Sequence, residues 1–309
     1  MKKIVFYYFI ISILSIISCS GPAKEATEKG NQKLRVVTTT GLLYDAVVHI
    51  GGDHVAAEAI MGPGVDPHLY KATQGDLSRI NKADLVIYNG VALEGKMSEI
   101  LEKLGRQKEV FAAAESIPKE RLIKFSGYED LMDPHVWFDI QLWKLVVQGI
   151  SERLQKLDTG KASIYQSNTA SFLKELDVLD SFVNQRLKEV PEPQRILVTA
   201  HDAFGYFGNA YDINVQGLQG ISTVAEFGLK DIADIVDLIL EKKIKAIFVE
   251  TSVSDKSIQA VLTGCREKGH EVNIGGFLYS DAMGAIGTEE GTYVGMFKKN
   301  VNTIVDALK

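Results

Sequence analysis

Residues 161–190, KASIYQSNTASFLKELDVLDSFVNQRLKEV, contain neither glycine nor proline. Their apolar side chains recur at helical spacing, at Phe172, Leu173, Leu176, Leu179 and Val183. This periodicity predicts one long helix. Asp158 and Thr159 precede it as start signals, and Pro191 and Pro193 follow it as stop signals. About 30 helical residues extend roughly 45 Å, the breadth of a domain. We expect a stiff helix that joins two lobes and permits little hinge motion.

Short β-branched stretches alternate with helical segments on both sides of this helix, which predicts parallel sheets covered by helices. Before the helix, predicted strands lie at 34–39 and 84–88; after it, strands at 195–199 and 245–250 repeat the order. We therefore predict an α/β fold of two pseudo-symmetric lobes with mainly parallel sheets. Chance similarity within a repeating strand–helix chain is the alternative.

These patterns divide the folded part of the chain into three segments. We place the N-terminal lobe at 33–155, the linking helix at 156–192 and the C-terminal lobe at 193–309. A metal site is expected in the cleft between the two lobes, for the reasons that follow.

The N-terminus has the features of a secretory signal. Two lysines precede an apolar run over residues 4–17, which is shorter than a membrane span needs. A serine then stands directly before Cys19, as in the lipobox of bacterial lipoproteins, although the two preceding isoleucines depart from the commonest pattern. We predict a lipoprotein signal peptide over 1–18, acylation of Cys19, and a flexible tether over 19–32. An ordinary secretory signal is the alternative.

Composition excludes some function classes. The 309 residues are 46% hydrophobic and 24% charged, as in average globular proteins. The formal net charge of −6, without any Lys/Arg-rich stripe, argues against nucleic acid as a partner. Acylation of Cys19 leaves Cys265 as the sole remaining cysteine, so no intramolecular disulfide is expected. We expect a monomer in which Cys265 is a small buried side chain without a role of its own.

The tripeptide Asp-Pro-His occurs twice, ending at His68 and at His135, and each copy is followed by an apolar and an aromatic residue. Proline fixes its own φ and favours an extended residue before it, so each loop presents its imidazole on a stiff backbone. Asp66 and Asp133 can each accept the spare ring N–H of a histidine, as groups behind metal ligands do. Two coincidental surface loops are the alternative.

Two further candidates lie in the predicted C-terminal lobe. His201 stands at the C-terminal end of a predicted strand, where parallel α/β sheets bind ligands, and Asp281 follows the apolar stretch 274–278. Taken alone, each is better explained as a helix N-cap or a satisfied buried polar group. With His68 and His135 they supply four nitrogen and oxygen donors, two from each lobe, which is the number that a tetrahedral ion takes.

The motifs that carry a family resemblance are DPH (66–68), NG and LE (within 89–94), DPHVW (133–137), TAHDAF (199–204), GIST (220–223), FVE (248–250) and YSDAMG (279–284). Over residues 34–308 the chain resembles the TroA-like solute-binding proteins, which are zinc- and manganese-binding lipoprotein receptors of ABC importers. The resemblance implies two α/β lobes, a long spanning helix and a metal in the interlobe cleft. It implies these ligands: His68, His135, His201 and Asp281. We assign Asp66, Asp133 and Glu250 to the groups that surround them.

The sequence departs from the family pattern in two places. Many members have Glu-Pro-Ser where this chain has Glu226-Phe227-Gly228, so we expect a different loop shape there. Residues 116–132 contain no histidine, whereas dedicated zinc scavengers often carry a histidine-rich loop in the first lobe. We therefore expect no auxiliary zinc-loading loop.

The donor set favours zinc first and manganese next. Imidazole suits zinc well, and manganese-selective members of the family commonly have Glu where this chain has His201. A bidentate Asp281 would add a fifth donor and make manganese or iron acceptable. The resemblance implies an extracytoplasmic protein, lipid-anchored to a bacterial membrane, that delivers the ion to a permease. The permease and its ATPase must be separate chains.

A zinc-dependent hydrolase and a surface adhesin are the alternatives from other classes. In a hydrolase, Glu226 or Glu250 would act as base if one ligand were misassigned. Catalytic zinc, however, usually has three protein ligands and an open position for water, and the chain has no His-Glu-x-x-His helix. We predict that the protein is not an enzyme. The sequence argues neither for nor against an adhesin.

Overall fold

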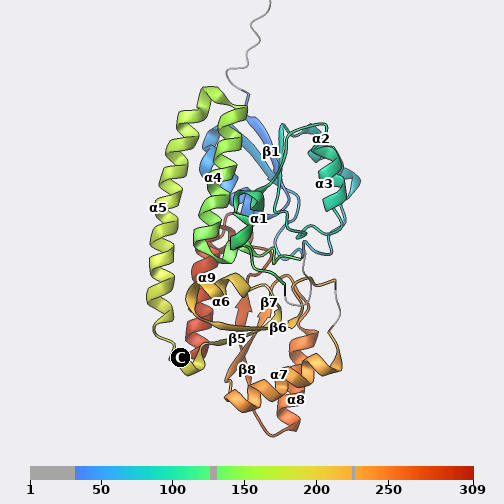
Figure 1. The fold of residues 1–309 in the computed structure, drawn as a ribbon, viewed down its shortest axis with the longest axis vertical. Coiled ribbons are helices and arrows are strands. Elements are labelled where there is room, and N and C mark those ends of the chain that lie inside the picture. The colour runs from blue at the N-terminus through green and yellow to red at the C-terminus, as the bar shows by residue number, and fades with distance from the viewer. Residues whose placement is uncertain (1–31, 126–130, 225–226) are drawn as a thin grey trace, which may run out of the picture. The chain divides into compact units, whose positions relative to one another are not determined.

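The computed structural model describes residues 32–125, 131–224 and 227–309. The predicted signal peptide, Cys19, most of the predicted tether and Glu226 lie outside these residues. Across the described ranges, no helix has the length and apolar character needed to cross a membrane. Residues 33–309 form one compact unit, which contains both lobes (Figure 1).

A four-stranded parallel sheet, in the order β2-β1-β3-β4, forms the centre of the N-terminal lobe. Its strands are β1 (Leu34–Thr38), β2 (Val55–Ala59), β3 (Leu85–Tyr88) and β4 (Val110–Ala112). The helices of this lobe are α1 (Gly41–Gly51), α2 (Gln74–Lys82), α3 (Ser98–Leu104) and α4 (Ile140–Leu157). Figure 1 shows them on either side of the sheet.

Alternate residues of the central strands enter two different cores. Val36 and Leu85 belong to the large core that includes α1, α4 and α5, whereas Val37 and Val86 belong to a smaller core that includes α2 and α3. A parallel strand covered on both faces must be apolar on both faces. This explains why β3, with the sequence LVIY, is a continuous apolar run rather than an alternating one.

The C-terminal lobe repeats this plan with two parallel pairs of strands. β5 (Ile196–His201) pairs with β6 (Asn214–Gln219), and β7 (Ala246–Glu250) pairs with β8 (Asn273–Leu278). β5 and β7 contact each other, which gives the spatial order β6-β5-β7-β8. The helices of this lobe are α6 (Gly205–Tyr211), α7 (Leu229–Lys242), α8 (Lys256–Glu267) and α9 (Tyr293–Leu308). The predicted two-lobe α/β fold with parallel sheets is confirmed.

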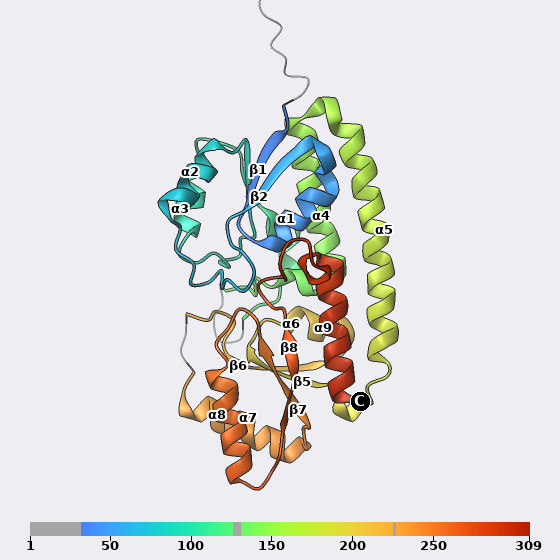
Figure 2. The same cartoon turned by 180° about the vertical axis from the view of Figure 1, so that it is seen from behind.

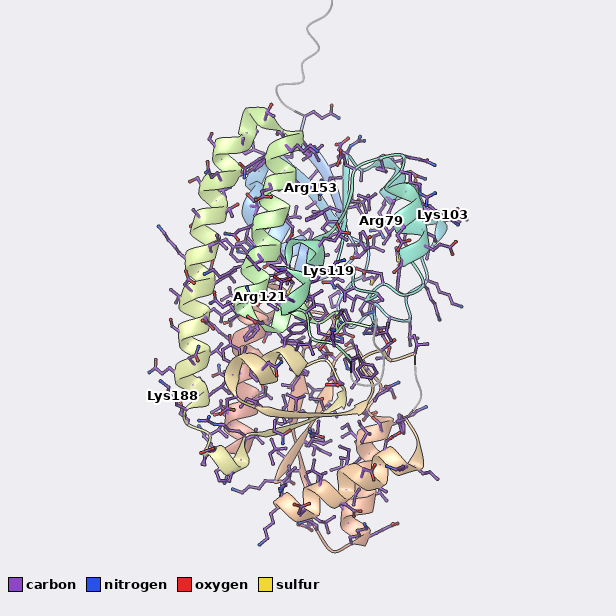
Figure 3. The ribbon with its side chains drawn as sticks, viewed as in Figure 1. Arg79, Lys103, Lys119, Arg121, Arg153 and Lys188 are labelled. Carbon is purple, nitrogen blue, oxygen red and sulfur yellow. The ribbon has the colours of Figure 1, made fainter. Side chains whose placement is uncertain are left out.

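The long helix is α5 (Ala162–Leu187), whose 26 residues extend roughly 39 Å. It is slightly shorter than the predicted stretch 161–190: it begins after a short 3₁₀ turn, Thr159–Lys161, that separates it from α4, and it ends at Leu187. Its apolar face packs against α1, α4 and α9 (Figures 1 and 2). Lys188, labelled in Figure 3, follows at its C-terminal end.

The first turn of α9 fastens the C-terminal lobe to the N-terminal lobe. The backbone N–H of Tyr293 donates to Asp45 of α1 at 3.1 Å, and its ring stacks on Trp143 of α4 with centroids 5.3 Å apart. The Tyr293 hydroxyl donates to the carbonyl of Trp137 at 2.7 Å. The lobes are therefore joined both by α5 and by the packing of α9. Within the N-terminal lobe, the guanidinium of Arg153 on α4 lies over the ring of Phe111, 4.7 Å from its centroid (Figure 3).

Candidate metal centre

Four buried side chains converge between the lobes. Each offers one nitrogen or oxygen atom, and these atoms lie within 4.8 Å of one another. The four, called the ligand cluster below, are His68, His135, His201 and Asp281. None is more than 2% exposed. The structure thus brings together all four side chains that the sequence predicts as ligands.

The spacing within the ligand cluster suits a small divalent ion. Nε2 of His135 lies 3.3 Å from Oδ1 of Asp281, while Nε2 of His201 and of His68 lie 3.3 and 3.6 Å from Oδ2. Donors bound tetrahedrally at about 2.0–2.2 Å would lie roughly 3.3–3.6 Å apart. These five atoms make no well-directed hydrogen bond to the described residues. Buried polar atoms without partners are costly, so their convergence fits residues that hold a metal.

His201 is fixed by a carboxylate on the neighbouring strand. It is the last residue of β5, and Glu250 is the last residue of β7. Oε1 of Glu250 accepts the backbone N–H of His201 at 2.8 Å, and Oε2 lies 2.5 Å from its Nδ1. One carboxylate therefore holds the backbone by a hydrogen bond and lies in ion-pair contact with Nδ1 of the ring, on the opposite side from Nε2, which faces Asp281.

His135 is oriented by the aspartate of its own tripeptide. Oδ1 of Asp133 accepts the backbone N–H of His135 at 2.9 Å and lies 2.7 Å from its Nδ1. The first residue of α6 must come close to this carboxylate, since a Cβ at Gly205 would lie 2.8 Å from Oδ2 of Asp133. The ring contact foreseen for this aspartate is present.

In the first Asp-Pro-His loop, the aspartate has different partners from those of Asp133. Oδ1 of Asp66 accepts the backbone N–H of His68 at 2.8 Å, but Oδ2 accepts the hydroxyl of Thr223 at 2.6 Å. The second oxygen is thus engaged by a residue of the C-terminal lobe. Asp66 holds the backbone of His68, and the contact with its ring that the sequence suggested is not the one observed.

Asp281 lies in a braced loop that follows β8. Its neighbour Ser280 accepts the indole N–H of Trp137 through its carbonyl at 3.1 Å. Asn300 of α9 accepts the backbone N–H of Tyr279 at 2.9 Å and donates to its carbonyl at 2.7 Å. Asn300 had no predicted role, although a buried asparagine on the apolar face of a helix is a recognisable signal.

A buried carboxylate in the N-terminal lobe was also missed. Glu94 is fully buried and accepts the hydroxyl of Thr39 at 2.7 Å and the backbone N–H groups of Asn89 and Gly90 at 2.6 and 3.1 Å. The amide of Asn89 then donates to the carbonyl of Pro134 at 3.0 Å, directly before His135. Burial raises the pKa of Glu94, although these bonds favour its charged form. The pair supports the second Asp-Pro-His loop from the N-terminal lobe.

The pKa values of the two histidines of the repeated tripeptide are shifted in opposite directions. Burial lowers the pKa of His68 to about 4, although Asp281 opposes this shift. Burial also disfavours the charged form of His135, but Asp133 and Asp281 outweigh it and raise its pKa to about 9.

His201 and Asp281 form a strongly coupled charge pair. Burial lowers the pKa of His201, but Glu250 and Asp281 overcome it and raise the value well above the usual range. Burial raises the pKa of Asp281, but His201 and His135 overcome it and lower the value well below the usual range. Without metal, these shifts favour the protonated form of His201, so a cation that binds this imidazole would compete with a proton.

Comparison with known proteins places this site in context. The chain matches the family model described as zinc-uptake complex component A, periplasmic (ZnuA), over residues 36–307. It is 51% identical to the manganese-binding lipoprotein MntA of Bacillus subtilis (strain 168) over 284 residues, 92% of each chain. It is 45% identical to the zinc-binding protein TroA of Treponema pallidum (strain Nichols) over 286 residues, 93% of this chain and 92% of that protein.

A solved structure supports the same relationship. The periplasmic zinc-binding protein TroA from Treponema pallidum superposes with a TM-score of 0.87 at 45% identity. The superposition covers 90% of this chain and 99% of that chain.

Proposed function

This chain belongs to the family of periplasmic zinc-uptake complex component A, and on that premise we propose that it is the solute-binding component of an ABC importer for a divalent transition metal. The observation that carries the proposal is the buried ligand cluster, in which Nε2 of three imidazoles and both oxygens of one carboxylate converge without a well-directed hydrogen bond to the described residues. The cation is the cargo of this protein.

We propose that Nε2 of each histidine and the carboxylate of Asp281 ligate the ion. Asp133 and Glu250 would act behind His135 and His201, where each carboxylate fixes the ring and raises the basicity of the ligating nitrogen. Asp66 would act through the backbone of His68 rather than through its ring.

The donor number favours carriage over catalysis. A catalytic zinc has three protein ligands and an open position for water, whereas four protein donors converge here. Glu250 engages His201 and is not free to act as a base. We therefore propose that the protein has no enzymatic activity. No observation favours an adhesin.

For the ion, we propose that zinc binds most tightly and that manganese is the weaker competitor. Affinity for nitrogen and oxygen donors rises from manganese to zinc along the Irving–Williams order. Both oxygens of Asp281 face the ligand cluster, so a bidentate carboxylate would supply a fifth donor for manganese. The relative that is 51% identical is named as manganese-binding, so delivery of manganese in the cell is compatible with tighter binding of zinc.

The remaining parts of the function are proposed from the family and the N-terminal sequence. Cys19 would carry the lipid that anchors the protein on the extracytoplasmic face of a bacterial membrane. The permease and its ATPase would be separate chains that receive the ion.

Metal analysis of protein purified without added metal, followed by zinc and manganese titrations, tests the proposal. We expect one ion per chain and displacement of manganese by equimolar zinc. The double substitution H68A/H201A should abolish stoichiometric binding while the fold, followed by circular dichroism, is retained. Wild-type affinity for one zinc ion in that variant would contradict the assignment of the ligands.

A further inference from the structure

Three of the four proposed ligands are fastened to the C-terminal lobe. His201 and Asp281 belong to it. The loop of His135 precedes α5 in the chain and is supported by Asn89 of the N-terminal lobe, but two further hydrogen bonds attach it to the C-terminal lobe. The Tyr206 hydroxyl donates to the carbonyl of Asp133 at 2.9 Å, and the Trp137 indole donates to the carbonyl of Ser280 at 3.1 Å. These three ligands form a platform that does not depend on the first Asp-Pro-His loop.

His68 is attached to that lobe in a much weaker way. Among the described residues, one hydrogen bond outside the ligand cluster ties its loop across the cleft, from the hydroxyl of Thr223 to Oδ2 of Asp66 at 2.6 Å. The same carboxylate accepts the backbone N–H of His68 through Oδ1 at 2.8 Å. Any movement of Thr223 away from Asp66 is therefore transmitted to the backbone that carries His68.

The surroundings of this hydrogen bond are built to hold it. Thr223 is only 8% exposed, and its carbonyl accepts the side-chain amide of Gln219 at 2.9 Å, which ties it to the end of β6. A cavity of about 290 Å³ lies beside it, lined by His68, Pro134 and residues 220–222. His68 thus lines this cavity, although it is only 2% exposed.

We propose that the hydrogen bond between Thr223 and Asp66 is a latch that keeps His68 on the bound ion and sets how long the metal remains. The proposal rests on the proposed function. The platform receives the ion, His68 completes the coordination, and Thr223 is the positioning residue that holds it there. Release begins when the latch opens and His68 leaves first.

The test is the rate of zinc release from protein shown beforehand to hold one zinc. Zinc-loaded protein is mixed with the chelator 4-(2-pyridylazo)resorcinol in a stopped-flow instrument, and the rate is extrapolated to zero chelator. Thr223→Val keeps the shape of the side chain but removes the hydroxyl. Since a hydrogen bond to a charged group is stronger than a neutral one, we expect release about tenfold to a hundredfold faster. Thr223→Ser keeps the hydroxyl and should remain within about threefold of wild type.

Thr169→Val is the matched control. Thr169 of α5 is 7% exposed, and its hydroxyl bonds to Ser151 of α4 and to the carbonyl of Tyr165 of α5, both at 2.7 Å. This change should lower thermal stability without altering zinc release. Release from Thr223→Val within about twofold of wild type would overturn the latch, and so would equal acceleration in Thr223→Ser. If wild-type protein binds no zinc, the proposed function itself fails. If it binds zinc but Thr223→Val releases zinc at the wild-type rate, only the latch proposal fails.

Discussion

The two Asp-Pro-His loops have the same tripeptide but different partners. In the second loop, Asp133 contacts both the backbone N–H and the ring Nδ1 of His135. In the first loop, Asp66 contacts the backbone N–H of His68 and gives its other oxygen to Thr223. The pKa of His135 is raised to about 9, whereas that of His68 is lowered to about 4.

This difference teaches that the tripeptide supplies a stiff loop and an available carboxylate, but the rest of the fold decides how the carboxylate is used. Where the aspartate faces the ring, the imidazole is oriented and its protonated form is favoured. Where a hydroxyl from the other lobe reaches the aspartate, the carboxylate links two lobes instead. We therefore interpret the second loop as part of a rigid platform and the first as the movable closure.

The largest expected effect comes from deleting each imidazole in turn. His135→Ala should weaken zinc binding by about a thousandfold or more, because it removes a donor of the platform and deprives the buried Asp133 of its contact with the ring. His68→Ala should reduce the affinity for zinc by a factor about tenfold smaller than His135→Ala does, because the three-ligand platform survives. Competition titrations against a chelator of known affinity measure both. Equal losses would show that the two loops contribute alike.

A smaller effect is expected from the aspartates themselves. Asp133→Asn should weaken zinc binding about tenfold to a hundredfold, since it removes the charge behind a ligating imidazole. Asp66→Asn keeps an oxygen for the backbone N–H of His68, and its amide group can still donate to the hydroxyl oxygen of Thr223. Since Asp66 does not contact the ring of His68, we expect zinc binding to weaken less than about tenfold. The same titrations compare the pair, and a greater loss in Asp66→Asn would reverse the roles assigned to the two loops.

Much of this architecture could be predicted from local patterns. The uninterrupted helical periodicity around Phe172 identified α5, and the apolar β-branched runs identified β1 and β7. The repeated tripeptide and the position of His201 at a strand end pointed to the ligand cluster. In each case, the signal lies within a few neighbouring residues.

The contacts that distinguish the two loops could not be predicted in this way. Thr223 and Asp66 are 157 residues apart, and nothing in either segment specifies the other. β2, with the sequence VAAEA, has weak strand propensity and is set by its pairing with β1. Asn300 acts on Tyr279 only because α9 packs on β8. Such roles depend on tertiary structure.

The smallest expected effect, and the one that compares the loops most directly, is the pH dependence of stability in the metal-free protein. The folded-state pKa of His135, about 9, lies above the unfolded value of about 6.5, so its contribution is complete below pH 6.5 and is lost as the pH rises towards 9. The folded-state pKa of His68, about 4, lies below that value, so its unfavourable effect grows as the pH falls from 6.5 towards 4.

Thermal unfolding in the presence of a chelator at pH 5, 6.5 and 8.5 tests both signs. His135→Gln should reduce the fall in Tm between pH 6.5 and 8.5 by a few degrees, because glutamine has no proton that is lost in this range, whereas His135 loses the one that Asp133 stabilises. His68→Gln should flatten the loss between pH 6.5 and 5, because the unfolded chain no longer gains a proton that the folded chain excludes. The two substitutions therefore act in separate pH ranges only if the loops differ electrostatically as they do in the structure. Flattening in the same range by both would mean that the partners of Asp66 and Asp133 do not separate the two histidines.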